Sequence, residues 1–400
     1  MRFWGVTGTN GKTTTTWIAA AFINADPTRK CGYVTTVEVN TGARRFHTGY
    51  TTPPLDQLKE IFAEMEANGC TDCVMEVSSH AIHQRRTGDT VFSGGVFTNL
   101  SEDHLDYHKT MEAYFDVKLD FARRIAAAHP TAPDMARRDL PPYVVCLDGG
   151  YGREMFNAVG NLAVNVIGVS AGALGAAGTD RAGFDLSGLQ LAGDYNKSNV
   201  LCAAALAEAA GVAREAIQSV IPTLKPRWGR LEEVKTGGRG SPRAFVDFAH
   251  TPDGLEKVLM AARGFTPKGK KLWIVFGAGG DRDPMKRPLM GAVCAKLADR
   301  LVVTSDNPRS EDPMAIVNAI LGGIDSNERA FNQSNTVFVE PDRAKAIALA
   351  LSRADEGDVV IIAGKGHETT QEVKGVKHPF DDREVVRNFK GQPKRKEEPE

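Results

Sequence analysis

The chain has 400 residues, of which 42% are apolar and 25% charged, and its 49 basic and 50 acidic residues give a formal net charge of −1. This composition is that of a globular protein of two or three domains, and it excludes collagen, a disordered chain and a disulfide-stabilised miniprotein. A nearly neutral chain gives no general reason to expect binding to nucleic acid or to an anionic membrane. No apolar run reaches the ~20 residues that span a bilayer and no signal peptide is recognisable, so we expect a cytoplasmic protein without membrane insertion.

The first part of the chain alternates short apolar segments with helical ones. It begins with a predicted strand over Arg2–Thr7, a glycine-rich loop over Gly8–Gly11 and a helix from Lys12 to Asn24. Further strands are predicted over Cys31–Val37, Cys73–Val77, Gly95–Thr98, Tyr143–Leu147 and Val164–Val169. Further helices are predicted over Leu55–Asn68, Met111–Ala127 and Lys197–Ala210. This alternation predicts an α/β fold with a mainly parallel sheet covered on both faces.

A glycine-rich segment near Arg230–Pro242 indicates a domain boundary, and a second α/β pattern follows it. Its predicted strands are Ala244–Phe248, Leu272–Phe276, Arg300–Thr304 and Val359–Ala363, and its predicted helices are Leu255–Arg263, Met285–Ala298 and Pro313–Leu321. We therefore predict one domain over residues 1–230, a second, Rossmann-like domain over residues 231–390 and a charged, disordered tail over residues 391–400.

Cysteine spacing gives little sign of a metal centre. Only Cys70 and Cys73 are spaced like metal ligands, and no second pair is present to complete a four-sulfur zinc site. We therefore expect reduced thiols.

The loop after the first strand has the composition of a phosphate-binding loop. Gly8 and Gly11 let the backbone approach phosphate groups closely, and the N-terminus of the following helix attracts negative charge. Lys12 can reach the β- and γ-phosphates, and the hydroxyl of Thr13 can hold Mg²⁺. The order of strand, loop and helix favours this interpretation over an ordinary glycine-rich turn.

The segment Gly8-Thr-Asn-Gly-Lys-Thr13 resembles the ATP loop of the Mur ligase superfamily, which also contains folylpolyglutamate synthetases. Further segments follow the order found in its MurE-type branch, which adds the third residue to the UDP-N-acetylmuramoyl stem peptide: Met75–His80, Thr98–His108, Trp228–Glu232, Val246–Asp253, Asp306–Arg309 and Gly364–Glu368. The resemblance covers about residues 2 to 385. It implies a P-loop-type central domain, a Rossmann-like second domain and an ATP-dependent amide ligase of peptidoglycan synthesis, and so of cell shape and division, that forms an acyl phosphate.

The resemblance also implies which residues hold the nucleotide and its metal. Those expected to bind ATP are Gly8, Thr9, Asn10, Gly11, Lys12, Thr13, Thr14, Asn99, Asn196, Asn199, Arg230 and Asp247. The expected Mg²⁺ ligands are Thr13, Glu76, His104 and a carbamylated Lys118, and the expected catalytic residues are Lys12, Glu76, His104 and Lys118. By pattern alone, Lys118 would be a surface lysine and His104 a polar loop residue, so both assignments depend on the resemblance.

The two other substrates have their own expected residues. The acceptor carboxylate would be bound by Thr51, Thr52, Ser79, Gln84 and Arg86, and either Arg85 or Arg86 would face its glutamate. The amino acid would be bound by Arg287, Asp306, Asn307, Arg309, Gly364 and Glu368. In the family, the segment Asp306-Asn-Pro-Arg309 accompanies meso-diaminopimelate, because an arginine can bind its second carboxylate through two hydrogen bonds.

The sequence departs from the family in two places. Relatives begin with a domain that binds UDP, whereas here the ATP-loop strand starts at Arg2, so the sequence is truncated, a separate partner binds UDP, or the acceptor has none. A small antiparallel sheet that precedes Asn196 in the family is expected only in part, over Phe184–Tyr195. We expect a monomer that uses ATP and Mg²⁺ and acts on small-molecule substrates.

Three alternative functions remain open. The first is a ligase of the same class whose acceptor is a small peptide or metabolite without UDP. The second is a folylpolyglutamate synthetase, against which the segments Asp306–Arg309 and Gly364–Glu368 argue. The third is a non-catalytic subunit of a cell-wall complex, which would have no need of the intact Lys12, Thr13, Glu76, His104 and Lys118.

Overall fold

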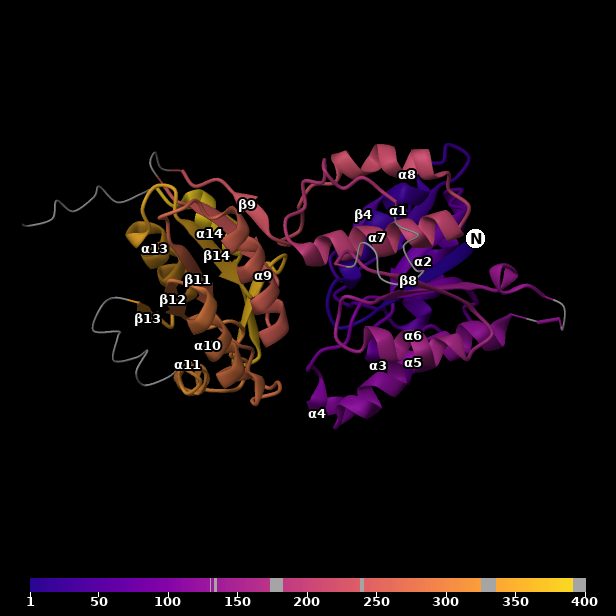
Figure 1. The fold of residues 1–400 in the computed structure, drawn as a ribbon. Coiled ribbons are helices and arrows are strands. Elements are labelled where there is room, and N and C mark those ends of the chain that lie inside the picture. The colour runs from indigo at the N-terminus through magenta and orange to yellow at the C-terminus, as the bar shows by residue number, and fades with distance from the viewer. Residues whose placement is uncertain (130, 133–134, 173–182, 238–240, 325–335, 391–400) are drawn as a thin grey trace, which may run out of the picture. The chain divides into compact units, whose positions relative to one another are not determined.

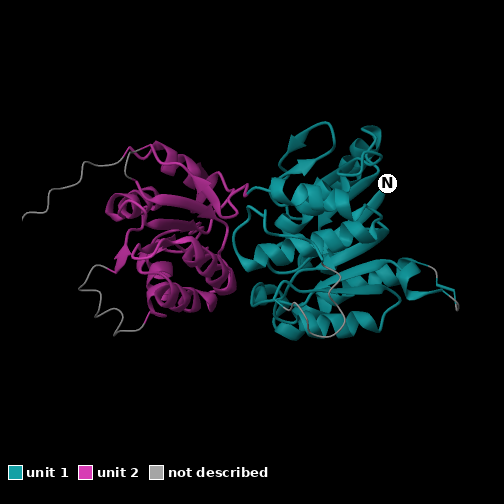
Figure 2. Ribbon diagram, turned by 45° about the horizontal axis from the view of Figure 1, so that its top comes forward, with its two compact units in different colours: residues 1–225 teal, residues 226–400 magenta. Residues whose placement is uncertain are grey.

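The computed structural model describes residues 1–390 except 130, 133–134, 173–182, 238–240 and 325–335. The predicted tail, residues 391–400, lies outside the described residues. The chain forms two compact units, Met1–Lys225 and Pro226–Glu400 (Figure 2). None of the helices in the described ranges is long and apolar enough to cross a membrane.

Unit 1 is built on a mainly parallel sheet with the strand order β4-β3-β2-β5-β1-β6-β7-β8. The strands are β1 Arg2–Thr7, β2 Cys31–Val34, β3 Val39–Asn40, β4 Arg45–Phe46, β5 Asp72–Glu76, β6 Phe92–Phe97, β7 Pro142–Cys146 and β8 Asn165–Val169. At one edge, β3 pairs antiparallel with β2 and β4 pairs antiparallel with β3. All the other neighbours are parallel. Because parallel neighbours need a crossover, a helix follows most of these strands.

The helices of unit 1 cover both faces of this sheet. They are α1 Lys12–Ile23, α2 Leu55–Ala67, α3 Ser79–His83, α4 Leu105–His108, α5 Met111–Ala128, α6 Gly152–Gly160, α7 Asp194–Ala209 and α8 Arg214–Val220, with short 3₁₀ turns at Arg137–Asp139 and Ile221–Thr223. Helices α1, α7 and α8 pack together on one side, and α5 packs against α6 on the other (Figure 1). Phe121 and Ile125 of α5 join Met155 and Val159 of α6 in one buried apolar cluster.

Unit 2 contains a second mainly parallel sheet, with the strand order β13-β12-β11-β14-β10-β9, and a separate hairpin, β15-β16. The strands are β9 Glu232–Val234, β10 Arg243–Asp247, β11 Leu272–Phe276, β12 Arg300–Val303, β13 Val337–Val339, β14 Val359–Ala363, β15 Thr370–Val373 and β16 Val376–Pro379. Only β9 in the larger sheet pairs antiparallel. The helices are α9 Pro252–Phe265, α10 Lys286–Leu297, α11 Pro313–Leu321, α13 Arg343–Arg353 and α14 Asp382–Asn388.

The predicted α/β class with mainly parallel sheets is confirmed. Predicted strands and helices form close to their expected bounds, although α7 begins at Asp194, three residues before the predicted Lys197. The expectation of a partial antiparallel sheet over Phe184–Tyr195 is wrong, because residues 183–193 contain no strand and α7 then begins. All six cysteines are buried and free.

Candidate functional site

Residues 8–11 form a tight loop at the carboxyl end of β1, directly before α1. Asn99 shapes this loop: its side-chain oxygen accepts a hydrogen bond from Asn10 N at 2.9 Å, and its side-chain amide donates to Asn10 O at 3.1 Å. Gly11 has a φ of +84°, and a Cβ there would lie 2.4 Å from Asn199 Oδ1. Glycine is therefore required where the backbone turns into the helix, as in loops that bind phosphate groups.

The predicted nucleotide residues of α1 lie at the N-terminal end of this helix. Lys12 Nζ donates to Gly8 O at 3.0 Å and to Thr9 O at 2.8 Å, so the ammonium lies over the loop. Thr13 and Thr14 follow within the first helical turn, and both are buried. The positive end of the helix dipole and the Lys12 ammonium thus act at the same place, which favours a bound anion.

Helix α7 contributes the two predicted asparagines to the same end of unit 1. Asn199 Nδ2 donates to Asn196 Oδ1 at 3.3 Å, and Asn199 Oδ1 accepts from Thr15 Oγ1. Asn199 therefore connects α7 to α1 directly behind the loop. Asp148, which the sequence reading missed, accepts a hydrogen bond from Ser198 Oγ at 2.6 Å and so holds the start of α7 to the segment after β7.

Glu76 is the last residue of β5, and it pairs in register with Val6 of β1, next to the phosphate loop. Its side chain is buried, and its carboxylate accepts hydrogen bonds from Thr36 N at 2.8 Å and Thr36 Oγ1 at 3.1 Å. Thr36, which the sequence reading also missed, thus fixes the direction of a carboxylate at the carboxyl edge of the sheet, where metal and phosphate sites of α/β folds usually lie.

Lys118 is completely buried in α5, contrary to what its sequence pattern alone favoured. Its Nζ has no hydrogen-bond partner among the described residues and lies 4.6 Å from the centre of the Tyr114 ring. Burial, together with the nearby charge of Lys12, lowers the pKa of Lys118 well below its ordinary value. Burial without a hydrogen-bond partner therefore favours the uncharged form of this amine more than in an exposed lysine.

Tyr114 joins several of these residues, although the sequence reading gave it no role. Its hydroxyl lies 3.2 Å from Thr9 Oγ1, and its ring stacks on His108 and lies edge-on to His104. The only sequence signal for this position was its spacing of four from Lys118, which places both side chains on one face of α5. Tyr114 thus contacts both the phosphate loop, through Thr9, and the buried Lys118.

The fit of a divalent cation can be judged from the donors present. The hydroxyl of Thr13 and the carboxylate of Glu76 are oxygen donors of the kind that Mg²⁺ prefers. His104 precedes α4, and its Nε2 lies 3.4 Å from Asp103 Oδ2. Burial lowers the pKa of His104 to about 4, so its ring is neutral near pH 7 and can act as a ligand. An ammonium at Lys118 would repel the cation, whereas a carbamate there would add two oxygens. No cluster of three or more His, Cys, Asp or Glu side chains in the described chain is arranged to hold a metal. Thr13 and Glu76 therefore supply suitable donors for Mg²⁺, and oxygens from a bound substrate would have to complete its coordination.

The predicted acceptor residues gather around the end of β5. Thr52 Oγ1 donates to Glu76 O at 2.9 Å, and Ser79 Oγ lies 2.9 Å from His108 Nε2. Arg86 Nη1 donates to Thr52 O and Arg86 Nε to Gln84 Oε1. Thr51 Oγ1 accepts from Thr36 Oγ1 at 3.0 Å, so this set adjoins Glu76. Arg86, and not the exposed Arg85, contacts the other predicted residues.

In unit 2, Asp247 ends β10 and is buried. Its carboxylate accepts hydrogen bonds from Leu231 N and Ala249 N, both at 2.7 Å. Burial raises its pKa above the ordinary value, although Arg230 and these backbone donors act in the opposite direction. The Arg230 guanidinium lies over the ring of Phe248, at 4.4 Å, so the two predicted nucleotide residues of this unit are neighbours.

Five predicted amino-acid-binding residues come together at the carboxyl ends of β12 and β14. Asn307 Nδ2 donates to Glu368 Oε2 at 2.9 Å, and a Cβ on Gly364 would lie 2.9 Å from Asp306 Oδ2. Arg309 Nη1 donates to Gly280 O at 2.6 Å. The ammonium of Lys365, which the sequence reading passed over, lies among them and is bonded to Asn307 Oδ1 and Glu368 Oε2, both at 3.0 Å.

Arg287, the sixth predicted residue, is placed differently. It is buried at the start of α10, where two nitrogens of its guanidinium bind Glu311 at 2.7 and 2.8 Å. These hydrogen bonds hold the pKa of Glu311 below its ordinary value. Arg287 reaches the others only through the glycine-rich loop after β11, since it also donates to Gly279 O at 3.3 Å.

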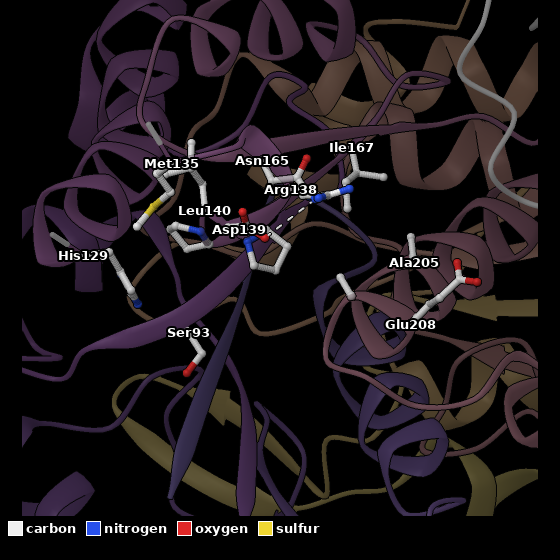
Figure 3. A pocket seen from close by; sticks show the side chains of 13 residues that line it. Ser93, His129, Met135, Arg138, Asp139, Leu140, Asn165, Ile167, Ala205 and Glu208 are labelled. Carbon is white, nitrogen blue, oxygen red and sulfur yellow. Dashed lines mark ion pairs between the residues drawn. The ribbon is translucent and has the colours of Figure 1, made fainter. Parts of the chain in front are cut away.

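A pocket of about 640 Å³ lies elsewhere in unit 1, at the start of β7 and β8 and so at the opposite edge of the sheet from the phosphate loop (Figure 3). Its lining includes His129, Leu140, Asn165 and Glu208. None of the predicted site residues lines it. In each unit, the candidate residues therefore lie at the carboxyl edge of that unit's own sheet, and none of them lines this pocket.

Comparison with known proteins identifies the class that this geometry fits. Residues 6–207 match the Mur ligase middle domain, and residues 229–366 match the glutamate ligase domain of Mur ligases. The chain belongs to the Mur ligase family.

Within this family, the chain is similar to curated ligases named for 2,6-diaminopimelate. It is 40% identical to the UDP-N-acetylmuramoyl-L-alanyl-D-glutamate-2,6-diaminopimelate ligase of Synechococcus elongatus, covering 96% of this chain and 75% of that protein. It is 38% identical to the ligase of the same name from Neisseria meningitidis serogroup A, covering 96% of this chain and 77% of that protein.

Solved structures give the same placement. A structure of a ligase with that name has 32% identity and a TM-score of 0.59, and the match covers 96% of this chain and 77% of that one. The folylpolyglutamate synthase of Mycobacterium tuberculosis, with 18% identity, a TM-score of 0.60 and coverage of 91% and 88%, shares the fold.

Proposed function

We propose that this protein is an ATP-dependent, ADP-forming amide ligase that joins meso-diaminopimelate to the D-glutamate carboxylate of UDP-N-acetylmuramoyl-L-alanyl-D-glutamate. The observation that carries the proposal is the similarity of about 40% to ligases of this name across 96% of the chain, which includes both units. The phosphate loop and the acceptor residues of unit 1, together with the cluster around Arg309 in unit 2, would bind the three substrates that such a reaction requires. We further propose that the protein is a cytoplasmic monomer.

The reaction has two steps. An oxygen of the acceptor carboxylate attacks the γ-phosphorus of ATP. An oxygen–phosphorus bond forms, the bond from the γ-phosphorus to ADP breaks, and the products are an acyl phosphate and ADP. The amine of the amino acid then attacks the acyl carbon, an amide forms, and phosphate and a proton leave. Because negative charges meet in the first step, the protein must mainly bring them together and offset their repulsion.

The residues of unit 1 suit the first step. Lys12 and the N-terminal end of α1 would hold the phosphates of ATP, with Asn99 and Asn199 maintaining the loop. Arg86, whose guanidinium forms a planar fork, would bind a carboxylate of the acceptor beside Thr52. Asp247 and Arg230, which are neighbours in unit 2, would contact the ribose and a phosphate.

We propose that Mg²⁺ is held by Thr13, Glu76, His104 and carbamylated Lys118, where it would neutralise phosphate charge. The carbamate would form when the neutral amine of Lys118 attacks CO₂, giving an N-carboxylate and releasing one proton. The lowered pKa of this buried lysine supports the reaction, because only the neutral amine is nucleophilic.

A phosphate-release assay tests the function directly. The chain would be mixed with ATP, Mg²⁺, meso-diaminopimelate and either UDP-N-acetylmuramoyl-L-alanyl-D-glutamate or free L-alanyl-D-glutamate. We expect phosphate release that depends on diaminopimelate and on the UDP-linked acceptor. Phosphate release with free L-alanyl-D-glutamate but not with the UDP-linked dipeptide would show that the acceptor carries no UDP. No phosphate release with either acceptor would refute the proposal.

Arg309→Lys tests the identity of the amino acid. We expect the KM for meso-diaminopimelate to rise by about tenfold or more, because an ammonium cannot bind a carboxylate through two parallel hydrogen bonds. The KM for ATP should change by less than about twofold. Equal effects on both constants, or no effect on either, would remove Arg309 from the amino-acid site.

A further inference from the structure

The ammonium of Lys365 is completely buried in the cluster at the carboxyl ends of β12 and β14. Its backbone position is set by two flanking glycines with positive φ, Gly364 at +118° and Gly366 at +53°. Residues with a Cβ rarely adopt these conformations, so glycine is favoured on both sides of Lys365. A long charged side chain with no exposed surface cannot bind a ligand itself and must act on its neighbours.

Two hydrogen bonds from Lys365 Nζ determine the orientation of Asn307 and Glu368. Asn307 Oδ1 accepts from Lys365 Nζ at 3.0 Å and from Glu372 N at 2.9 Å. The amide oxygen is thus occupied by two donors, and its NH₂ group points to Glu368 Oε2 at 2.9 Å. Lys365 Nζ binds the same Oε2 at 3.0 Å.

These hydrogen bonds hold the carboxylate of Glu368 in one orientation. Oε2 of Glu368 receives both donors, whereas its side chain is 33% exposed, and Oε1 has no hydrogen bond in the described chain. Lys365 Nζ also lies 3.6 Å from Asp306 Oδ1, a buried oxygen without a hydrogen bond, so one cation faces two carboxylates. Removing it would take away the cation that contacts both carboxylates and would leave the buried Arg343 guanidinium, which also interacts with Asp306 and Glu368, to offset their charge.

We propose that Lys365 is the positioning residue that makes this site select an amino acid with a distal ammonium, by fixing Glu368 so that its second oxygen faces the ligand. This inference rests on the proposed function, which places the amino acid at Arg309 and Glu368. It adds that selectivity depends on a lysine that does not touch the ligand.

The test compares two ligands that differ only in the distal amine: meso-diaminopimelate and 2-aminopimelate. Their binding to the full chain would be measured by calorimetry in the presence of ATP and Mg²⁺, so that the readout does not depend on turnover. The wild-type chain should bind diaminopimelate more tightly. In Lys365→Met, the affinity for diaminopimelate should fall by about tenfold or more, which corresponds to the loss of a hydrogen bond to a charged group. The affinity for 2-aminopimelate should change by less than about threefold.

Three further variants complete the design. Glu368→Gln should reproduce the loss for diaminopimelate, and Lys365→Met combined with Glu368→Gln should be no worse than Glu368→Gln alone, because both changes remove the same contact. Lys377→Met, an exposed lysine of β16, serves as the matched control and should bind both ligands like the wild type. The KM for ATP and the melting temperature would be recorded for each variant.

The outcomes separate the inference from the proposed function. Equal losses for both ligands in Lys365→Met, or no preference for diaminopimelate in the wild type, would overturn the inference. If Lys365→Met does not fold, it is replaced by Lys365→Gln and by the double variant, which removes both charges. If all three variants are unfolded, Lys365 is purely structural and the inference is overturned. Absence of phosphate release from a wild-type chain that binds diaminopimelate selectively would refute the proposed function alone.

Discussion

Among single residues, Lys118 has the most unusual surroundings in unit 1. A fully buried ammonium without a hydrogen bond is costly, because no neighbour replaces the water it has lost. The ring of Tyr114, 4.6 Å away, offers only a weak attraction. Such a lysine destabilises the fold unless it is neutral or modified, so its presence at this position points to a chemical role.

Lys118→Met tests this interpretation, since methionine has a similar volume and no charge. We expect phosphate release to fall by about a hundredfold or more, a loss that bicarbonate does not restore. The melting temperature should be unchanged or higher, because replacing a buried amine that has no hydrogen-bond partner by an apolar side chain is usually neutral or stabilising. Lys59→Met, an exposed lysine on α2, is the control and should match the wild type. A fully active Lys118→Met would remove the carbamate from the mechanism.

At the scale of elements, the connection from β1 to α1 determines whether the nucleotide site forms. The connection is only four residues long, and it is enclosed by the start of α7 through Asn199 and by the segment after β6 through Asn99. Strand, loop and helices therefore form one assembly in which each part limits the position of the others.

Gly11→Ala should disrupt this assembly. The new Cβ would lie 2.4 Å from Asn199 Oδ1, and φ at +84° is unfavourable for alanine by about 1–2 kcal/mol. Gly69→Ala is the matched control, because its φ is +74° but no atom lies within 4 Å of its Cβ position. We expect similar backbone strain in both variants and a rise in the KM for ATP of about tenfold or more only in Gly11→Ala. A normal KM for ATP in Gly11→Ala would show that the loop tolerates displacement.

At the scale of the whole molecule, the buried imidazole of His108 makes the stability of unit 1 depend on pH. The residue is 6% exposed, and its pKa is lowered from 6.5 to about 4, first by burial and then by the neighbouring His80. The folded state therefore disfavours the proton. Above pH 6.5, His108 is mostly neutral in both the folded and the unfolded chain and does not reduce the free energy of unfolding. As the pH falls towards 4, the unfolded chain binds the proton first, so the free energy of unfolding decreases.

We expect His108→Gln to flatten this dependence. Between about pH 6 and pH 4.5 the free energy of unfolding of unit 1 should fall less steeply in the variant than in the wild type, by up to about 1.4 kcal/mol per pH unit. Hydrogen exchange in residues 1–225 at several pH values measures the difference. Identical slopes in the two proteins would mean that folding does not lower the pKa of His108.

The elements that could be predicted from sequence are those whose signal is local. Apolar runs such as Leu272–Phe276 and Val359–Ala363 form strands at the predicted bounds, because strands buried on both faces need continuous apolar sequence. The two-residue strands β3 and β4 were not predicted, since their pairing depends on the turns that join β2 to β3 and β3 to β4 and not on their own composition.

The sequence by itself determined the α/β class, the phosphate loop and the candidate residues that lie in contiguous motifs, because backbone propensity and short-range spacing are properties of neighbouring residues. Only the tertiary structure decided that Lys118 is buried, that Tyr114 borders the loop and that Lys365 orients Asn307, which lies 58 residues away. These relations depend on which face of a helix packs inward and on which strand ends meet. Both are set by contacts between residues far apart in the chain, to which local patterns are insensitive.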